Sequence, residues 1–286
     1  MKIEIDHATV CGSSLDELRR TFADAGLTTD YGGPHANGVT HMALLGFEDG
    51  SYLELIAPMK PETAASGLTA GWAKLMHSDA GAGAWAIRTS NIEEEVDRLR
   101  AAGIEVTSPE HGGRKKVDGT ALRWQTAAAG PGSPGALLPF MIQDETSRDL
   151  RVRPSEGIRD TGLTGVGMVL LGVSELDTAI LSFRRAYGWA TPGIEEYPEL
   201  GARLAYFAST PVMLATPLDD RSWLASRLQH FGDCPSAFLL VTSDVEVASQ
   251  RFRLVQADTW FGRKLAWFED KKLHGARLGV VQSETL

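Results

Sequence analysis

Two histidines and one glutamate, His7, His41 and Glu54, are the residues of this sequence whose types and spacing could do chemistry together. His7 follows Ile3 and Ile5 at alternate positions of a predicted strand. Alternate side chains of a strand share a face, so we expect His7 to point to the face that these apolar residues choose. His7 should therefore reach the concave side of a sheet.

A predicted hairpin places the other two residues. It has strands at residues 39–47 and 51–57. If Phe47 pairs with Tyr52 across the turn, His41 lies on the same face as Glu54. A carboxylate buried on an apolar sheet face is costly unless it is paired, hydrogen-bonded or bound to a metal. The two imidazoles and the carboxylate are thus expected to converge.

Two interpretations of this cluster are open. Two imidazoles and one carboxylate suit a divalent metal such as Fe, Mn, Ni or Zn with open coordination positions. The metal would polarise a carbonyl oxygen while Glu54, the candidate catalytic residue, moves a proton. Alternatively, the histidines form hydrogen bonds to each other, to Glu54 or to the backbone. A binding cleft without a metal is the favoured interpretation.

Further residues are candidates for contacts with a small molecule. An apolar and aromatic wall is typical of small-molecule pockets, although the same residues could equally be plain core. Its predicted members are Trp85, Trp124, Phe140 and Met141. His35, in a glycine-rich loop, is expected near the mouth of the cleft, with a structural turn as the alternative. Arg114 opens the basic run 114–116, which could attract a carboxylate or phosphate or form a solvated turn.

The elements that must position these residues recur about every 70 to 80 residues, as a strand, an amphipathic helix and then further strands. Copies begin near residues 3, 83, 165 and 237. Each such unit has one open apolar sheet face, so two units side by side should curl into a half-barrel around a cleft. The predicted fold class is α+β, with tandem βαβββ modules that form two half-barrel domains.

The predicted domains are residues 1–145 and 163–286, because residues 146–162 are rich in charge and lack apolar periodicity. The second domain keeps the repeat, but it has no comparable set of histidine and glutamate residues. We therefore expect it to be degenerate and the site to lie in the first domain.

Composition restricts the partners. The chain has 286 residues and a formal net charge of −9, which disfavours nucleic acid and anionic membranes. Two isolated cysteines suit a reducing cytoplasm. We expect a cytoplasmic protein with a small-molecule ligand, and a homodimer is left open.

Several segments of the first 145 residues resemble the glyoxalase-like domain family of the vicinal oxygen chelate superfamily, which also includes bleomycin resistance proteins and dioxygenases. They are Ile5-Asp6-His7, Gly38-Val39-Thr40-His41, Asp49-Gly50 with the strand after it, Asp118-Gly119, and Leu138-Pro139-Phe140-Met141-Ile142. Beyond residue 162 only the βαβββ repeat is similar.

The resemblance implies a metal ligand on the first strand of a module and another, often Glu, on the last. Carried over, these positions are His7 and Glu54, whereas the second module offers Trp85 and Met141, which cannot bind a hard divalent ion. The first module thus keeps a half-site. The implied function is metal-dependent lyase or isomerase chemistry on a carbonyl or vicinal-oxygen substrate. The alternatives are non-catalytic sequestration of a small molecule, as in resistance proteins, and a role of the paired domains in assembly.

Overall fold

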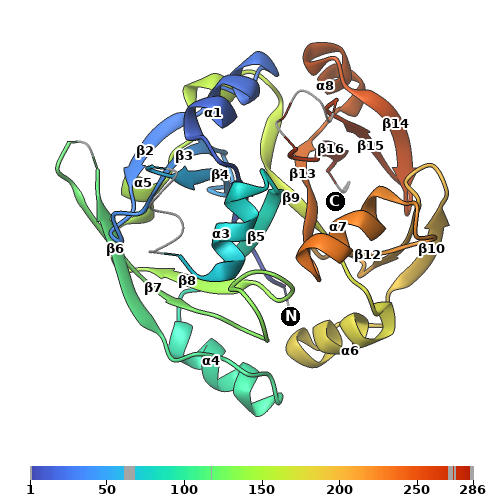
Figure 1. The fold of residues 1–286 in the computed structure, drawn as a ribbon, viewed down its shortest axis with the longest axis horizontal. Coiled ribbons are helices and arrows are strands. Elements are labelled where there is room, and N and C mark those ends of the chain that lie inside the picture. Colours follow the sequence, from blue (N-terminus) through green and yellow to red (C-terminus); the bar gives the residue numbers. More distant parts are fainter. Residues whose placement is uncertain (1, 61–67, 117, 270–272, 274, 284–286) are drawn as a thin grey trace.

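A computed structural model describes residues 2–60, 68–116, 118–269, 273 and 275–283. Within these residues, the strands form two eight-stranded sheets that lie side by side and curl in the manner of half-barrels (Figure 1). The strand order is β2-β3-β4-β1-β5-β8-β7-β6 in the first sheet and β10-β11-β12-β9-β13-β16-β15-β14 in the second.

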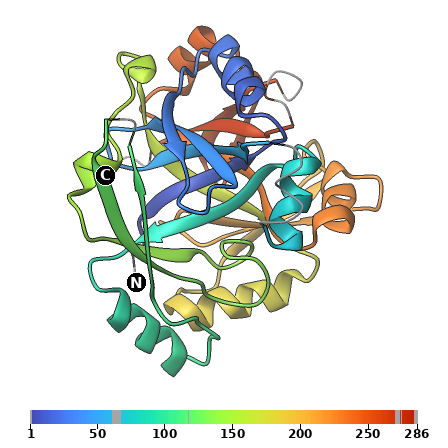
Figure 2. The ribbon, with the colours of Figure 1, turned by 60° about the vertical axis from the view of Figure 1, so that its left-hand side comes forward.

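The first sheet contains β1 (Ile5–Cys11), β2 (Asp30–Pro34), β3 (Thr40–Gly46), β4 (Tyr52–Pro58), β5 (Gly81–Arg88), β6 (Glu110–Lys115), β7 (Ala121–Ala127) and β8 (Phe140–Asp144). Its helices are α1 (Leu15–Asp24), α3 (Ala70–His77) and α4 (Ile92–Ala101). Figure 2 brings this half of the molecule forward.

The second sheet contains β9 (Leu163–Gly172), β10 (Gly193–Tyr197), β11 (Ala202–Tyr206), β12 (Val212–Pro217), β13 (Cys234–Thr242), β14 (Val255–Trp260), β15 (Arg263–Trp267) and β16 (Leu278–Gln282). Its helices are α6 (Leu176–Tyr187), α7 (Trp223–Phe231) and α8 (Val245–Phe252). Between the sheets lie α5 (Arg148–Arg151) and the 3₁₀ helix η2 (Glu156–Ile158).

The predicted repeat is confirmed. Each module runs strand, helix and three strands, and its first strand pairs in parallel with its last, as β1 does with β4 and β9 with β12. The first strands of the two modules in each half pair antiparallel, β1 with β5 and β9 with β13. The fold is therefore α+β with tandem βαβββ modules that form two half-barrels.

Polar caps start the module helices where the sequence offers them. The Ser14 side chain accepts a hydrogen bond from the Glu17 amide at the start of α1, and Asn91 caps α4 in the same way. Both helices carry acidic residues in the first turn, which the helix dipole favours. No helix in the described part of the chain is long and apolar enough to cross a membrane.

The two halves share one hydrophobic core, which lies between β1 and β5 of the first sheet and β9 and β13 of the second (Figure 1). Trp85 of β5 stacks on Phe183 of α6, with ring centroids 6.5 Å apart. Arg98 of α4 donates a hydrogen bond to the Ala186 carbonyl across the same boundary, at 2.6 Å. The face of the first sheet turned away from this core is called the cleft face, because the sequence predicts a ligand cleft on it.

The segment predicted as a linker packs against the first sheet. The Gly46 amide donates to the Ser155 hydroxyl, and the Ser155 amide donates to the Gly46 carbonyl, both at 3.0 Å. The strands of the first sheet end at Asp144 and those of the second begin at Leu163. The domain limits themselves stay a prediction.

Candidate functional site

A bulge in β1 puts His7 on the cleft face. The pairing of β1 with β5 shifts between Ile5 and His7, so Ile5 enters the shared core while His7 points to the other side. The His7 ring stacks on Tyr52 of β4, with centroids 4.8 Å apart. The expected shared face with Ile5 was therefore wrong, because a bulge interrupts strict alternation. His7 nevertheless reaches the concave side.

Three side chains form a line across the cleft face. His7 Nδ1 lies 2.6 Å from Asp6 Oδ1, and His7 Nε2 lies 4.0 Å from Glu54 Oε2. All three residues are buried. Since an ionised carboxylate only accepts hydrogen bonds, Nδ1 of His7 carries the proton of the Asp6 contact. Asp6 thereby fixes the imidazole and leaves Nε2 turned toward Glu54.

Two arginines hold Asp6 in its charged form. Arg151 donates to both Asp6 oxygens, at 3.0 and 2.8 Å, and Arg148 donates to Oδ2 at 2.5 Å. Burial by itself raises the pKa of Asp6, but the hydrogen bond with His7 and the charge of Arg151 hold that pKa well below its usual range. Arg151 also binds Asp144 and the Tyr52 hydroxyl. Asp6 is thus a permanent negative charge behind His7.

Glu54 is also kept ionised. Its Oε1 lies 3.3 Å from Nε2 of His35, and its Oε2 accepts a hydrogen bond from the Thr9 hydroxyl at 3.1 Å. Burial by itself raises the pKa of Glu54, but the hydrogen bond from His35, the charges of His7 and His35, and the bond from Thr9 lower it to about 2. His35 was predicted near the mouth of the cleft, and the structure places it against Glu54.

His41 does not join this cluster, which corrects the predicted trio. The β3–β4 hairpin pairs Gly46 with Tyr52, so Leu44 rather than Leu45 lies opposite Glu54. This shift of one residue turns His41 to the opposite face. There its ring meets the edge of Tyr31 at 6.1 Å, and burial lowers its pKa.

Trp85 and Met141 do not line the cleft, because both are fully buried in the shared core on the other face. Their strand neighbours Ala86 and Phe140, which pair with each other, take the cleft face instead. The Trp85 indole donates to the Leu137 carbonyl at 3.1 Å, which satisfies its polar atom inside the core. These two residues have a packing role.

Phe140 and Trp124 are half-buried on the cleft side of β8 and β7. The Phe140 ring meets the edge of His7, with centroids 5.3 Å apart. Arg114 of β6 is buried and donates to the Gly32 carbonyl of β2. That these three contact a ligand stays a prediction.

A sequence model of the glyoxalase-like domain family matches residues 5–179, which span the whole first half and extend into α6. The chain belongs to the glyoxalase-like domain family. No curated protein sequence matches this chain at a significant level.

Several solved structures are similar to this glyoxalase-like protein over all or part of its length. A hypothetical protein from Staphylococcus aureus aligns over 98% of this chain and 100% of its own, with 15% identity and a TM-score of 0.63. Methylmalonyl-CoA epimerase from Mycobacterium tuberculosis aligns over 44% of this chain and 92% of its own, with 22% identity and a TM-score of 0.39. The Streptomyces coelicolor epimerase in complex with 2-nitronate-propionyl-CoA aligns over 43% and 97%, with 21% identity and a TM-score of 0.37. The first of these similarities shows that the two-sheet fold occurs entire in another protein.

The residues present do not fit the predicted three-ligand metal site of a glyoxalase-like protein. His41 lies on the wrong face, and no group of three or more His, Cys, Asp or Glu side chains in the described residues is arranged to hold a metal ion. Nε2 of His7 and Nε2 of His35 both approach the Glu54 carboxylate itself. The cluster is a hydrogen-bonded set of charged groups.

In the second glyoxalase-like half, apolar side chains fill the corresponding inner face. A separate core cluster there contains Met168 and Met213, the residues that the repeat aligns with His7 and Glu54, together with Trp260 and Trp267. Because the interior of this half is packed, its described residues offer no counterpart of the polar line in the first half.

Sequence reasoning missed Asp6 and Arg151. Asp6 was not among the predicted site residues, yet the bulge turns it inward with His7. Arg151 lies in the charge-rich segment that was predicted to separate the two domains. The adjacency of Asp6 and His7 was the one signal available, since a carboxylate beside a histidine often orients its ring.

Proposed function

We propose that this glyoxalase-like protein catalyses proton transfer on a small carbonyl compound, in an isomerase or lyase type of reaction. The observation that carries the proposal is the buried line Asp6–His7–Glu54, with separations of 2.6 and 4.0 Å. Ionisable groups that are buried next to one another are typical of acid–base sites. The proposed reaction uses the side chains of this line and no metal ion.

The roles of the two partners follow from their charge states. A carboxyl group with a pKa of about 2 is a weak base, because its proton affinity lies far below that of an ordinary catalytic base. His35 and Thr9 contact the Glu54 carboxylate whether or not His7 is charged, so we assign proton transfer to Nε2 of a neutral His7 and not to the carboxylate of Glu54. Glu54 and Asp6 instead stabilise the imidazolium that forms when His7 accepts a proton. The predicted catalytic role of Glu54 becomes electrostatic.

The substrate in this proposal carries a C–H bond next to a carbonyl group. His7 Nε2 takes the proton from carbon, the electron pair of that bond moves to the carbonyl oxygen as an enolate, and the proton returns to the same or a neighbouring atom. The rings of Tyr52 and Phe140, which contact His7, would exclude water from one side of the enolate.

The proposal is tested by hydrogen exchange in D₂O. The protein is incubated with a panel of 2-oxo acids, hydroxyaldehydes and acyl thioesters, and loss of the proton signal next to the carbonyl is followed by NMR. The wild-type protein should accelerate exchange of at least one compound, and His7→Asn should lower that rate by at least about 100-fold, since positioned general bases contribute roughly 10²–10⁴-fold.

His111→Asn is the matched control. His111 also lies beside a carboxylate, 2.7 Å from Glu145, but its side chain is 76% exposed. This variant should exchange at the wild-type rate. Binding of a panel compound without exchange would instead support sequestration, and exchange that EDTA abolishes and Zn²⁺ or Mn²⁺ restores would contradict the metal-free reaction.

A further inference from the structure

Arg114 is a buried guanidinium at the place where the two edges of the first sheet meet. β2 and β6 are the edge strands of that sheet, and Nη1 of Arg114 donates to the Gly32 carbonyl across the gap between them. The pairing of β2 with β3 skips Gly32, so this residue sits in a bulge. Arg114 is 7% exposed, although a guanidinium stays charged at any ordinary pH.

This guanidinium lacks the carboxylate that such a group normally requires. Among the described residues, no acidic side chain forms an ion pair or a hydrogen bond with Arg114, and burial lowers its pKa. A buried charge without a counter-charge is strongly destabilising. The charge of Glu54 acts on Arg114 from beyond contact distance. A ligand that supplied the missing negative charge would therefore be favoured at this point.

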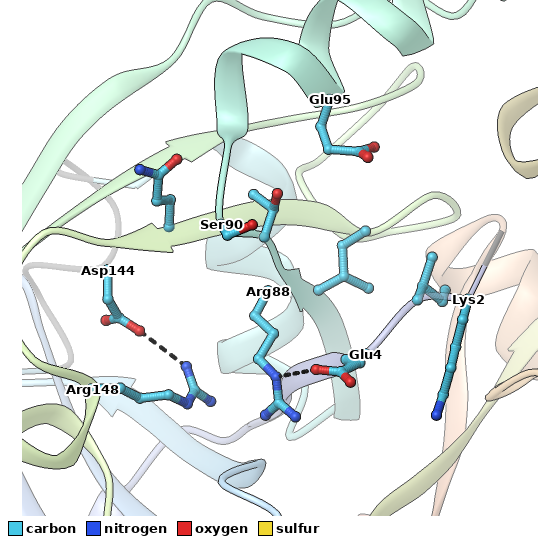
Figure 3. Close-up of a pocket in the computed structure, with 11 residues that line it drawn as sticks. Lys2, Glu4, Arg88, Ser90, Glu95, Asp144 and Arg148 are labelled. Carbon is cyan, nitrogen blue, oxygen red and sulfur yellow. Dashed lines mark hydrogen bonds and ion pairs between the residues drawn. The ribbon is translucent and has the colours of Figure 1, made fainter.

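Other arginines near the cleft are paired. Arg151 binds Asp6 and Asp144. In the cavity at the start of β1, which has a volume of about 690 Å³, Arg88 pairs with Glu4 at 2.7 Å and Arg148 with Asp144 at 3.1 Å (Figure 3). Both arginines of that cavity are therefore neutralised by a carboxylate. The contrast singles out Arg114.

Arg114 lines a different cavity of about 470 Å³ between β2, β6 and the segment of residues 149–154. The three other cations of its wall have acidic neighbours: Arg151 is paired as described above, Arg153 lies 3.6 Å from Asp149, and Lys116 acts on Asp118. Asp30 also lines the cavity, at its exposed side. The cavity is large enough for a small organic molecule or for the polar end of a longer one.

We propose that Arg114 binds an oxyanion, a carboxylate or phosphate group, of the substrate whose carbonyl end lies at His7. This inference rests on the proposed function for the location of the reacting carbon. The planar guanidinium forms paired hydrogen bonds with carboxylate and phosphate oxygens, which a bare point charge does not. The substrate class is then an anionic carbonyl compound. Arg114 anchors its charged end in the cavity between β2 and β6, and its neutral end extends to the cleft face.

The test measures anion binding directly. Inorganic phosphate and acetate are added separately to the protein, with sodium chloride at equal ionic strength as reference, and the thermal midpoint is recorded. A ligand that binds the folded state raises the midpoint with its concentration. Phosphate, acetate or both should raise the wild-type midpoint above the chloride value, and the stronger of the two identifies the group. Arg114→Gln should remove the rise, whereas Lys115→Gln, which removes a neighbouring exposed charge, should keep it.

Loss of the contact to Gly32 could itself unfold Arg114→Gln. Arg114→Lys is then the deciding variant, because lysine keeps the positive charge but cannot form the paired hydrogen bonds of a guanidinium. This variant should weaken anion binding at least tenfold. If Arg114→Lys and Arg114→Gln respond to anions as the wild type does, the proposal is wrong. It is also wrong if the wild type does not respond at all. Arg114 would then serve only to connect β6 to β2 through its hydrogen bond to Gly32.

The two proposals fail separately. His7→Asn should keep the anion response, since His7 lies outside the cavity, and Glu54→Gln should strengthen it by removing a nearby negative charge. If the wild type responds to anions but exchanges no C–H proton, the proposed reaction is wrong and the anion site stands. If Arg114→Gln catalyses exchange with the same Michaelis constant as the wild type, the oxyanion site is wrong and the proposed reaction stands.

Discussion

Asp6 is the residue on which the chemistry of the cleft depends most. It is fully buried, and its two oxygens are shared among His7, Arg148 and Arg151. A buried carboxylate held by this many charge-assisted hydrogen bonds keeps one geometry, because turning it would break several of them at once. The orientation of the His7 imidazole is therefore set before any ligand arrives.

The free energy of unfolding at acidic pH tests the charge state of Glu54. Its pKa is about 2 in the folded chain and roughly 4.3 when unfolded. A carboxyl group whose folded pKa is depressed stabilises the fold above its unfolded pKa, and this contribution is lost as the pH falls through the folded pKa. The difference in unfolding free energy between wild type and Glu54→Gln should thus shrink from about pH 5 to about pH 2.

Urea unfolding at a series of pH values measures this difference. Glu48→Gln, an exposed change of the same type in the β3–β4 turn, is the control. A pH-independent difference for Glu54→Gln would show that Glu54 is not held ionised by its neighbours.

Residue types alone predicted part of the site. His7 and Glu54 were predicted because a histidine and a buried carboxylate stand out on apolar strands, and the structure brings them to one face. His41 was placed wrongly because the face of a residue depends on the register of its strand, and composition does not encode register. His35 enters the cluster from the loop that follows β2, whose path no periodicity describes.

At the scale of elements, the two places where the sequence prediction failed are a bulge and a turn. The order of strands and helices follows from alternation, caps and glycines, and it was predicted for all four modules. The bulge in β1 and the one-residue difference in the β3–β4 turn change which side chains share a face, without changing that order. Fold class is therefore more predictable than the site it carries.

The contact between β3 and the segment after α5 gives a prediction at this scale. A methyl group at Gly46 would overlap the carbonyl oxygen of Arg153, and backbone atoms cannot rotate away. Hydrogen bonds between Gly46 and Ser155 fix the segment in place. Gly46→Ala should lower the unfolding free energy by about 1–3 kcal/mol, the usual cost of overpacking.

Chemical denaturation followed by circular dichroism would measure the Gly46→Ala effect. Gly193→Ala serves as the reference, because its added methyl group would meet only the edge of the Phe261 ring at 3.3 Å. Equal stability of the two variants would mean that the segment moves freely relative to β3.

The whole molecule is organised around the core that both halves share. Trp85 of the first half and Phe183 of the second are each fully buried there, and their rings stack. Arg227 of α7 adds a hydrogen bond to the Ala80 carbonyl at 2.7 Å. The halves should consequently unfold together.

Phe183→Ala tests this coupling. Removing a fully buried phenylalanine costs about 3–5 kcal/mol, and the loss should appear in a single unfolding transition seen alike by tryptophan fluorescence and circular dichroism. Leu181→Ala, on the same helix but 59% exposed, should change stability by no more than about 0.5 kcal/mol. Two separate transitions in the wild type would contradict a shared core.

The position of Arg151 has a consequence for how this chain can be divided or recombined. Every strand of the first sheet ends by Asp144, yet the guanidinium that neutralises Asp6 comes from α5, after the last of them. A fragment trimmed to the sheet alone would retain His7 and lose the counter-charge behind it. The smallest piece that could be grafted onto another protein with its histidine still oriented therefore extends through Arg151.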